Sequence, residues 1–264
     1  MARGRIGTQE LIPDIESALF FGHQTSHLAV GIVGVGTNAM SGLENEFRGY
    51  SLLRGNVYAR QKHFIPLYDL SSDGAEMDTD DERSVHLAII ENAATSTRVV
   101  GAMRLIIKSP EQSNLLPIEY HYPEAFPSRP APIFSAEVSR LICRHENKQV
   151  QTKLKWLLFT AGISCGSSRG LGPAFGAIDE RLSYLLSADG VPIRMIAKAK
   201  FVPSFNATKA PFRIDLERLN QKIEDDSPKL LKSMQVLNSE FVYSGVSSRE
   251  CDRTKAALIG SSVN

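Results

Sequence analysis

The sequence predicts an α/β fold in which a mixed central sheet is flanked by helices. Strand-like apolar runs at residues 85–90, 99–107 and 135–143 precede a stretch, 150–165, whose apolar residues recur at helical spacing. A short strand at 174–178, a second helix and a final strand at 193–201 continue the alternation. With 264 residues and 42% hydrophobic content, the chain can bury one large core.

The chain is expected to divide into three parts. Residues 1–40 have no clear period and form an N-terminal extension, and residues 41–225 form the α/β domain. Residues 226–264 are expected to be a C-terminal helix and a polar, Ser-rich tail.

The first elements of the domain are a helix and a hairpin. Ser41 is expected to cap the helix, and Arg54 falls on its apolar stripe, one turn from Tyr50 and Tyr58. An acidic loop at 66–83 leads to the strands at 85–90 and 99–107, which are expected to pair as a hairpin. The apolar stripe of the helix consists of Leu43, Phe47, Tyr50, Leu53 and Val57.

The second half begins after a Pro-rich connection at 110–132. Gly166 or Gly170 is expected to end the helix at 150–165, and Gly190 the next helix, which is marked by Ile178, Leu182 and Leu185. In the last strand apolar residues alternate with Arg194, Ile196, Lys198 and Lys200, which predicts one largely basic face.

The strand at 135–143 carries an acid and a base among apolar residues, Glu137 and Arg140. Burying either charge costs several kcal/mol unless it is paired or used. The strand is therefore the candidate reaction site. An alternative is a buried ion-pair network of Glu137, Arg140, Arg104 and Asp81 that fixes strand register, and both roles can coexist.

Composition excludes several classes of function. Lys and Arg (30) nearly balance Asp and Glu (29), so net charge gives no reason to expect nucleic acid or an anionic membrane as partner. The longest apolar run, Leu28–Gly36, is too short and too glycine-rich to span a bilayer, so we expect a cytoplasmic protein without an integral membrane segment. Three cysteines fit reduced thiols, and the six histidines show no ligand pair, so no metal is expected.

Four ordered motifs suggest a family. The chain resembles the autoinducer (acyl-homoserine-lactone) synthases and their relatives, the long-chain N-acyl amino acid synthases and the exosortase-associated acyltransferases, over roughly residues 45–215. The resemblance implies a GNAT-like N-acyltransferase fold. It rests on Arg54, Tyr58 and Phe64, on Asp78, Asp81, Ser84 and His86, on Gly101, Arg104 and Leu105, and on Glu137, Ser139 and Arg140.

The resemblance implies transfer of a medium or long acyl chain from a thioester to the amine of an amino acid or related metabolite. An α-amino group has a pKa of about 8 and must lose a proton before attack. Glu137 is assigned as the general base, with Arg104, Ser139 and Arg140 in the same catalytic group. The resemblance also implies that the strand splays just past Glu137, offers a backbone N–H to the oxyanion and leaves room for pantetheine.

The acceptor site is assigned to a second group. Arg54 is expected to bind an acceptor carboxylate, unless its side chain reaches solvent instead. Asp81 keeps the motif spacing better than Asp78, although either could be a solvated loop charge. Phe64 replaces the Trp of the autoinducer enzymes, which weakens the case for S-adenosylmethionine as acceptor. The full substrate-binding group is Arg54, Tyr58, Phe64, Asp78, Asp81 and Phe126.

The donor is expected to be an acyl carrier protein carrying a 4′-phosphopantetheine thioester. The loop 144–149 lacks the glycine-rich pattern that holds a CoA pyrophosphate, and this disfavours the alternative donor, acyl-CoA. Basic residues can dock the acidic carrier, although they could also form an ordinary solvated face. They are Arg144, Lys148, Lys153 and Lys155, together with Arg194, Lys198 and Lys200.

Other readings remain open. Gly31–Gly36 lacks the lysine of a phosphate-binding loop, and Cys143 is a core residue more readily than a nucleophile. The chain could be an acetyl-CoA-dependent GNAT acetyltransferase or a non-catalytic acyl-binding module. Presence of the Glu137 carboxylate disfavours the module, and a deep apolar pocket would disfavour acetyl transfer.

Overall fold

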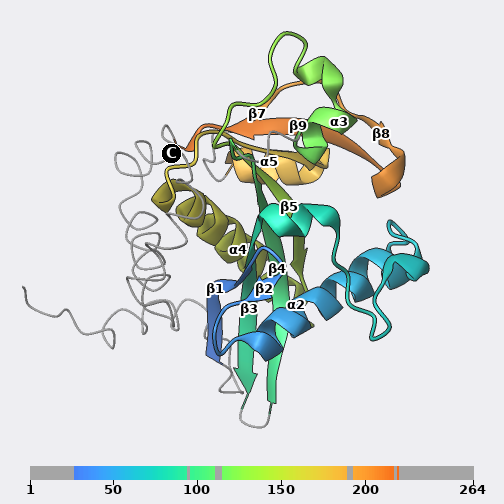
Figure 1. Ribbon diagram of the computed structural model, residues 1–264, viewed down its shortest axis with the longest axis vertical. Coiled ribbons are helices and arrows are strands. Elements are labelled where there is room, and N and C mark those ends of the chain that lie inside the picture. Colours follow the sequence, from blue (N-terminus) through green and yellow to red (C-terminus); the bar gives the residue numbers. More distant parts are fainter. Residues whose placement is uncertain (1–26, 94–95, 111–114, 189–192, 217–218, 220–264) are drawn as a thin grey trace, which may run out of the picture.

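The computed structural model describes residues 27–93, 96–110, 115–188, 193–216 and 219. These residues form a nine-stranded mixed sheet in the order β2-β1-β3-β4-β5-β6-β9-β7, with β8 paired to β9 (Figure 1). The predicted mixed sheet flanked by helices is confirmed. The C-terminal helix and tail expected at 226–264, and Gly190, lie outside the described residues.

The sheet begins within the segment expected to be an extension. Strand β1 (His27–Val35) pairs antiparallel with β3 (Ser84–Ala93), and β2 (Asn38–Ala39) pairs with β1. The glycines of β1 lower its strand propensity, which hides the strand from pattern analysis. The run Gly31–Gly36 therefore forms a strand and the turn after it.

Helix α2 (Glu44–Gly55) continues as a π-helix, Asn56–Gln61. The prediction that Ser41 caps it is wrong, because Leu43 holds the cap position. The Glu44 side chain instead accepts a hydrogen bond from the Gly42 amide (3.1 Å), and Glu44 and Glu46 place negative charge in the first turn. The predicted apolar stripe packs on the sheet through Phe47, Tyr50 and Val57.

The predicted hairpin and the strand that follows it are confirmed. β3 pairs antiparallel with β4 (Ser96–Ile107), and β4 pairs antiparallel with β5 (Ala136–Cys143). β5 runs parallel to β6 (Ala174–Ile178), and β6 pairs antiparallel with β9 (Ala207–Ile214). The parallel pair makes the sheet mixed and places the Glu137 strand near its centre.

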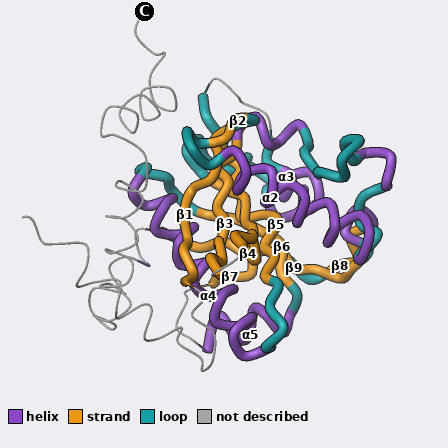
Figure 2. Tube along the Cα trace, turned by 90° about the horizontal axis from the view of Figure 1, so that it is seen from below, coloured by secondary structure: helices purple, strands orange, loops and turns teal. Residues whose placement is uncertain are grey.

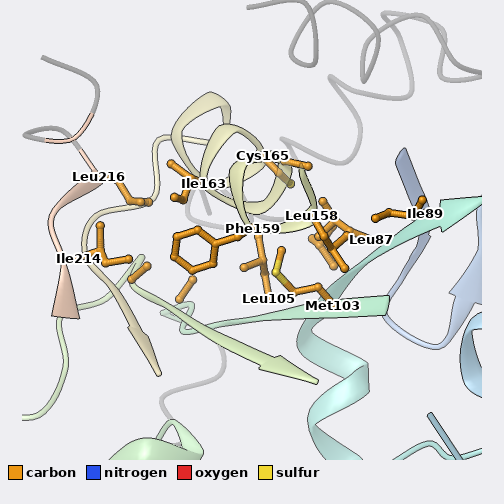
Figure 3. Packing of buried hydrophobic residues seen from close by; sticks show 14 of the residues in the cluster. Leu87, Ile89, Met103, Leu105, Leu158, Phe159, Ile163, Cys165, Ile214 and Leu216 are labelled. Atoms are coloured by element: carbon orange, nitrogen blue, oxygen red, sulfur yellow. The ribbon is translucent and has the colours of Figure 1, made fainter. Parts of the chain in front are cut away.

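Helices cover both faces of the sheet (Figure 2). Helix α4 (Lys148–Ser168) lies on one face, where Leu158 and Phe159 pack against Met103 and Leu105 of β4 (Figure 3). It ends before Gly170, which has a positive φ of 64°, whereas Gly166 lies inside the helix. Helix α5 (Glu180–Ala188) follows β6, while α2 and the short α3 (Pro117–His121) lie on the opposite face.

The single strand predicted at 193–201 is wrong. Two short strands, β7 (Ile193–Met195) and β8 (Lys200–Val202), pair separately with β9. Opposite the break lies Pro211 of β9, which has no N–H to extend the ladder, although its carbonyl accepts from the Ile196 amide (3.0 Å). The basic residues of this stretch therefore do not form one continuous strand face.

Neither a membrane-spanning helix nor a metal-binding cluster is found among the described residues. None of their helices combines the length and apolar character needed to cross a membrane. Nor do they contain a group of three or more His, Cys, Asp or Glu side chains placed to hold a metal ion.

Candidate functional site

The candidate site lies where β5 separates from β6. The two strands pair only at Ala136 with Ala174 and Glu137 with Phe175, and then diverge. On its other side β5 bulges: Arg140 and Leu141 lie between the residues that pair with β4, and Arg140 has a φ of +57°. The splay expected just past Glu137 is therefore present.

A cavity of about 500 Å³ opens at this splay. It is bordered by Tyr58 and Phe64, from the π-helix Asn56–Gln61 and the loop after it, and by apolar side chains of α4, α5 and β9. Of the predicted site residues, the cavity brings together Tyr58, Phe64, Glu137, Ser139, Arg140, Arg144 and Lys155. The apolar lining includes Leu141, Phe159, Ile178, Leu182, Leu186 and Phe212.

Glu137 lines the cavity but is itself only 4% exposed. Its Oε2 accepts a hydrogen bond from the Ile118 amide of α3 at 2.7 Å. Burial raises the pKa of Glu137 to about 8, and the Ile118 hydrogen bond and the Arg104 charge only partly offset that rise. A carboxyl group with this pKa is suited to exchanging a proton with an amine near neutral pH.

The buried ion-pair network considered above does exist, but with different members. It joins the guanidinium groups of Arg54, Arg104 and Arg140 to the carboxylates of three acids, Glu76, Asp78 and Asp81. Glu137 is not part of it, because its hydrogen-bond partner among the described residues is the Ile118 amide. Three positive and three negative groups leave the network neutral.

The two aspartates are held at the start of the 3₁₀ helix η4 (Thr79–Arg83), whose N-cap is Asp78. The Asp78 carboxylate accepts from the Asp80 amide (2.9 Å), and the Asp81 carboxylate accepts from the Asp78 amide (2.6 Å), which is the reciprocal arrangement of a capping box. Burial raises the pKa of each network acid, but the neighbouring guanidinium groups outweigh it and hold the pKa values below their usual range.

Arg54 does not lie where it was expected. Its side chain is fully buried, and its Nη1 and Nη2 donate to the two Asp81 oxygens at 2.7 and 3.0 Å, while Nε donates to Glu76. The expectation that it needs an outside carboxylate is therefore wrong, and so is the alternative that it reaches solvent. Arg54 is not among the cavity-lining residues, and neither are Asp78, Asp81 and Arg104.

Arg140 is the network cation that faces the cavity. Its Nη2 donates to Glu76 (2.8 Å) and Asp78 (3.0 Å), and its guanidinium lies 5.0 Å from the centre of the Tyr58 ring. Within the described part of the chain, its Nη1 has no hydrogen-bond partner. The Tyr58 and Phe64 rings lie 6.0 Å apart, so the cavity lining includes a cation beside two aromatic rings.

Arg104 and Ser139 connect the network to β5. Arg104 is 1% exposed, and its Nη1 donates to Asp78 and, at 2.8 Å, to Asp81. Its Nη2 lies 3.5 Å from the Ser139 hydroxyl, which borders the cavity. Arg104 thus supports the cavity wall from behind.

Two residues of this site were missed as functional. Glu76 was counted only among the charges of the acidic loop, and no sequence period marks it. Tyr50, counted only as an apolar residue, accepts from Arg54 (3.5 Å) and lies 3.1 Å from Nδ1 of His86. Nε2 of His86 lies 2.8 Å from the Gly36 carbonyl, and burial lowers the pKa of His86 to about 4, so a neutral imidazole links the turn after β1 to Tyr50 of α2.

The predicted donor-docking residues come from two segments, 144–155 and 194–200. Arg144 and Lys155 border the cavity, and Lys148 is exposed at the start of α4, while the side chain of Lys153 lies outside the described residues. Lys200 pairs with Glu124 (2.8 Å) and lies 4.7 Å from the Tyr122 ring centre. Arg194 and Lys198 are exposed.

The structure also bears on the expectations for Phe126 and Cys143. Phe126 packs edge to face on Phe175 (5.5 Å between ring centres) and is not a cavity-lining residue, so the structure does not bring it to the predicted substrate site. Cys143 borders the cavity, but burial raises its pKa to about 12. A thiol with that pKa is a poor nucleophile, which supports the core assignment.

A scan against protein-family models and a search of curated proteins found no match. Among solved structures, the chain is similar to the CoA-dependent acyl-homoserine lactone synthase BjaI with SAM and isopentyl-CoA. The TM-score is 0.55 at 18% identity, covering 80% of this chain and 99% of that one. The chain has the acyl-homoserine lactone synthase fold.

Two more structures share this fold. MesI, also a CoA-dependent acyl-homoserine lactone synthase, has a TM-score of 0.58 at 13% identity, covering 80% of this chain and 95% of that one. FeeM, an N-acyl amino acid synthase from uncultured soil microbes, has a TM-score of 0.52 at 12% identity, covering 76% and 97%. The predicted GNAT-like fold is thereby confirmed. At these identities the likeness establishes the fold, and the chemistry depends on the site residues.

Proposed function

We propose that the chain is an N-acyltransferase that moves a medium or long acyl group from a phosphopantetheine thioester to the amine of an amino acid or related metabolite. The cavity at the β5–β6 splay carries this proposal. It brings the Glu137 carboxyl together with apolar side chains and with a cation beside two aromatic rings.

The apolar lining of the cavity suits the acyl chain. Its members Phe159, Leu182, Leu186 and Phe212 come from three elements, α4, α5 and β9. An acetyl group would need no such lining, so the cavity favours a longer chain over acetyl transfer. The BjaI structure of the same fold was solved with isopentyl-CoA, which also supports a branched or longer acyl donor here.

The reaction follows from the position of Glu137. The neutral amine nitrogen attacks the thioester carbonyl carbon, and the Glu137 carboxylate takes the one proton that the nitrogen loses as the carbon–nitrogen bond forms. A backbone N–H of the splayed β5 stretch stabilises the negative oxygen of the tetrahedral intermediate. The carbon–sulfur bond then breaks, the thiolate leaves with the proton returned from Glu137, and an amide remains. Because the carboxyl pKa of about 8 lies close to that of an α-amino group, turnover should rise with pH toward 8.

The acceptor fits the cation and the two aromatic rings. We assign Arg140, in place of Arg54, to the acceptor carboxylate, because Arg140 lines the cavity and its Nη1 has no partner among the described residues. Tyr58 and Phe64 would pack against the rest of the acceptor. An amino acid satisfies both features, and FeeM supports that class of acceptor within this fold.

The donor is proposed to be a carrier protein. Lys62, Arg144 and Lys155 place positive charge around the cavity and can attract an acidic carrier. BjaI and MesI are CoA-dependent, so acyl-CoA is the donor to compare.

The test is a transfer assay with purified protein. Acetyl, octanoyl and tetradecanoyl thioesters of carrier protein and of CoA are combined with an amino acid mixture or with S-adenosylmethionine. Thiol release is recorded, and products are identified by mass spectrometry. We expect acceptor-dependent release and an N-acyl amino acid with a longer chain. Use of acetyl-CoA alone would establish an acetyltransferase, and tight donor binding without transfer would establish an acyl-binding module.

A further inference from the structure

A buried ion pair lies beside the site and has no part in the proposed reaction. Lys108 follows directly after β4, and its Nζ donates to both carboxylate oxygens of Glu119 at 2.8 and 3.0 Å. The two side chains are only 3% and 2% exposed. Burying such a pair costs several kcal/mol of desolvation per ion, so the presence of the pair is weak evidence for stability. A role in positioning the surrounding chain explains it better.

The Glu119 carboxylate also holds the backbone of the segment 115–131, which we call the cover segment. It accepts from the Leu116 amide (2.6 Å) at the start of α3 and from the Ala131 amide (2.7 Å) at the end of the segment. One carboxylate therefore joins both ends of the cover segment to Lys108, the residue directly after β4.

The first turn of α3 has one amide to give to Glu137. Pro117 has no N–H, the Leu116 amide is used by Glu119, and the Glu119 amide donates to the Leu116 carbonyl (2.9 Å). The remaining amide, that of Ile118, donates to Glu137. Leu116 and Ile118 are also buried in the apolar cluster that contains Ile106 and Phe175, the residues paired with Glu137 on the neighbouring strands.

We infer that Lys108 and Glu119 are positioning residues for Glu137: they hold the cover segment so that the Ile118 amide and the apolar side chains of α3 meet the Glu137 carboxyl. The role of Glu137 as the base rests on the proposed function. The contacts of Lys108 and Glu119 with each other and with the cover segment, which we call the clamp, do not.

The surroundings of Glu137 determine how its pKa would change if the cover segment loosened. The charged groups that act on it are Arg104 of β4 and Asp80 and Arg83 of η4, and Arg83 donates to the Leu115 carbonyl (2.8 Å) of the cover segment. Burial is the largest influence on Glu137, ahead of the Ile118 hydrogen bond and these charges. If the cover segment loosens, water reaches the carboxyl and its pKa falls.

The test is a titration of Glu137 by carbon-13 NMR on the full chain with labelled glutamate, using Glu137→Gln to assign the signal. The main variant is Lys108→Met with Glu119→Leu, which removes both charges and leaves neither ion unpaired. We expect the proton affinity of Glu137 in this variant to fall at least tenfold, which appears as a lower titration midpoint. Lys108→Arg keeps a cation for Glu119 and should titrate like the wild type.

Two more variants keep the test decisive. Glu124→Gln removes a carboxylate from the same segment at its exposed ion pair with Lys200 and should leave the midpoint unchanged. If the double variant does not fold, Lys108→Met alone retains both backbone contacts of Glu119 and should show a smaller shift in the same direction. The inference is overturned if the folded double variant titrates like the wild type. If the double variant does not fold, the same outcome for Lys108→Met overturns it. An equal shift in Glu124→Gln also overturns it.

The titration separates this inference from the proposed function. If no donor supports acyl transfer but the Glu137 midpoint moves as expected, the clamp stands and the assigned reaction is wrong. If transfer is found and the midpoint does not move, the reaction stands and the clamp is wrong. Where both hold, the acid limb of kcat/KM should move to lower pH together with the midpoint.

Discussion

Glu137 combines two properties that a single side chain rarely has: it is almost fully buried, yet it borders a cavity large enough for a ligand. Glu137→Gln keeps its size and its hydrogen bond from Ile118. We expect turnover to fall by about 10²–10⁴-fold while binding of the acyl donor is retained. Thiol release measured with saturating donor and acceptor tests this, and undiminished release by the variant would exclude the role of base.

Arg140 and Arg54 should behave differently although both belong to the network. Arg140→Lys should raise the KM for an amino acid acceptor about tenfold or more with a smaller change in kcat, since Nη1 is lost and the one Lys ammonium group must also serve Glu76 and Asp78. The wild type should use the carboxamide of the same acceptor poorly. The difference between wild type and Arg140→Lys should be smaller with the carboxamide than with the amino acid. Arg54→Ala is the contrast: it leaves Asp81 buried without its bidentate partner, so its main effect should be a loss of about 3–5 kcal/mol in unfolding free energy.

The site could be predicted in part because charged residues stood out in apolar runs. Arg54 and Arg140 stand out on that basis and Arg104 through its motif, and all three lie in one buried network. Which of them faces the cavity depends on the bulge of β5, and no spacing in the sequence indicates a bulge. Glu76 was missed because one more acid in an acidic loop carries no pattern.

At the scale of elements, helices and strands with a strong apolar period were the predictable part. The α4 stripe and the β3–β4 hairpin are where periodicity placed them. β1 was missed because its glycines weaken the signal, and the strand at 193–201 was drawn as one because pairing is decided by the partner β9, in which Pro211 interrupts the ladder.

The first turns of α4 give the docking prediction. Lys148 is exposed there, and Lys153 follows on the same helix. Charge reversal, Lys148→Glu with Lys153→Glu, should weaken binding of acyl carrier protein and flatten its salt dependence, with activity on a small acyl-pantetheine unchanged. Arg98→Glu, at the far end of the β3–β4 hairpin, is the control and should leave carrier binding unaffected. Equal loss with both donors would indicate damage to the fold.

For the whole molecule, two buried groups oppose each other in the pH dependence of stability. Burial raises the pKa of Glu137 from 4.5 to about 8, so the folded state holds that proton more tightly and stability is lost as pH rises through this range. Burial lowers the pKa of His86 from 6.5 to about 4, so its contribution is lost as pH falls through that range.

A difference measurement isolates Glu137. The unfolding free energy of Glu137→Gln minus that of the wild type should increase between pH 4.5 and 8, by at most about 1.4 kcal/mol per pH unit, and then level off. Urea unfolding followed by circular dichroism at several pH values provides the measurement. A difference that does not change with pH would mean that Glu137 is not buried as described.

The dry setting of Glu137 also bears on the lifetime of the bound thioester. A carboxyl group that keeps its proton near neutral pH cannot activate water, so a donor that waits alone in the cavity is protected from hydrolysis. An arriving ammonium group brings a positive charge that favours the carboxylate, so the acceptor itself switches on the base. We therefore expect idle hydrolysis of the thioester, measured without acceptor, to climb as pH passes about 8, and the acceptor to be spared competition from water below that pH.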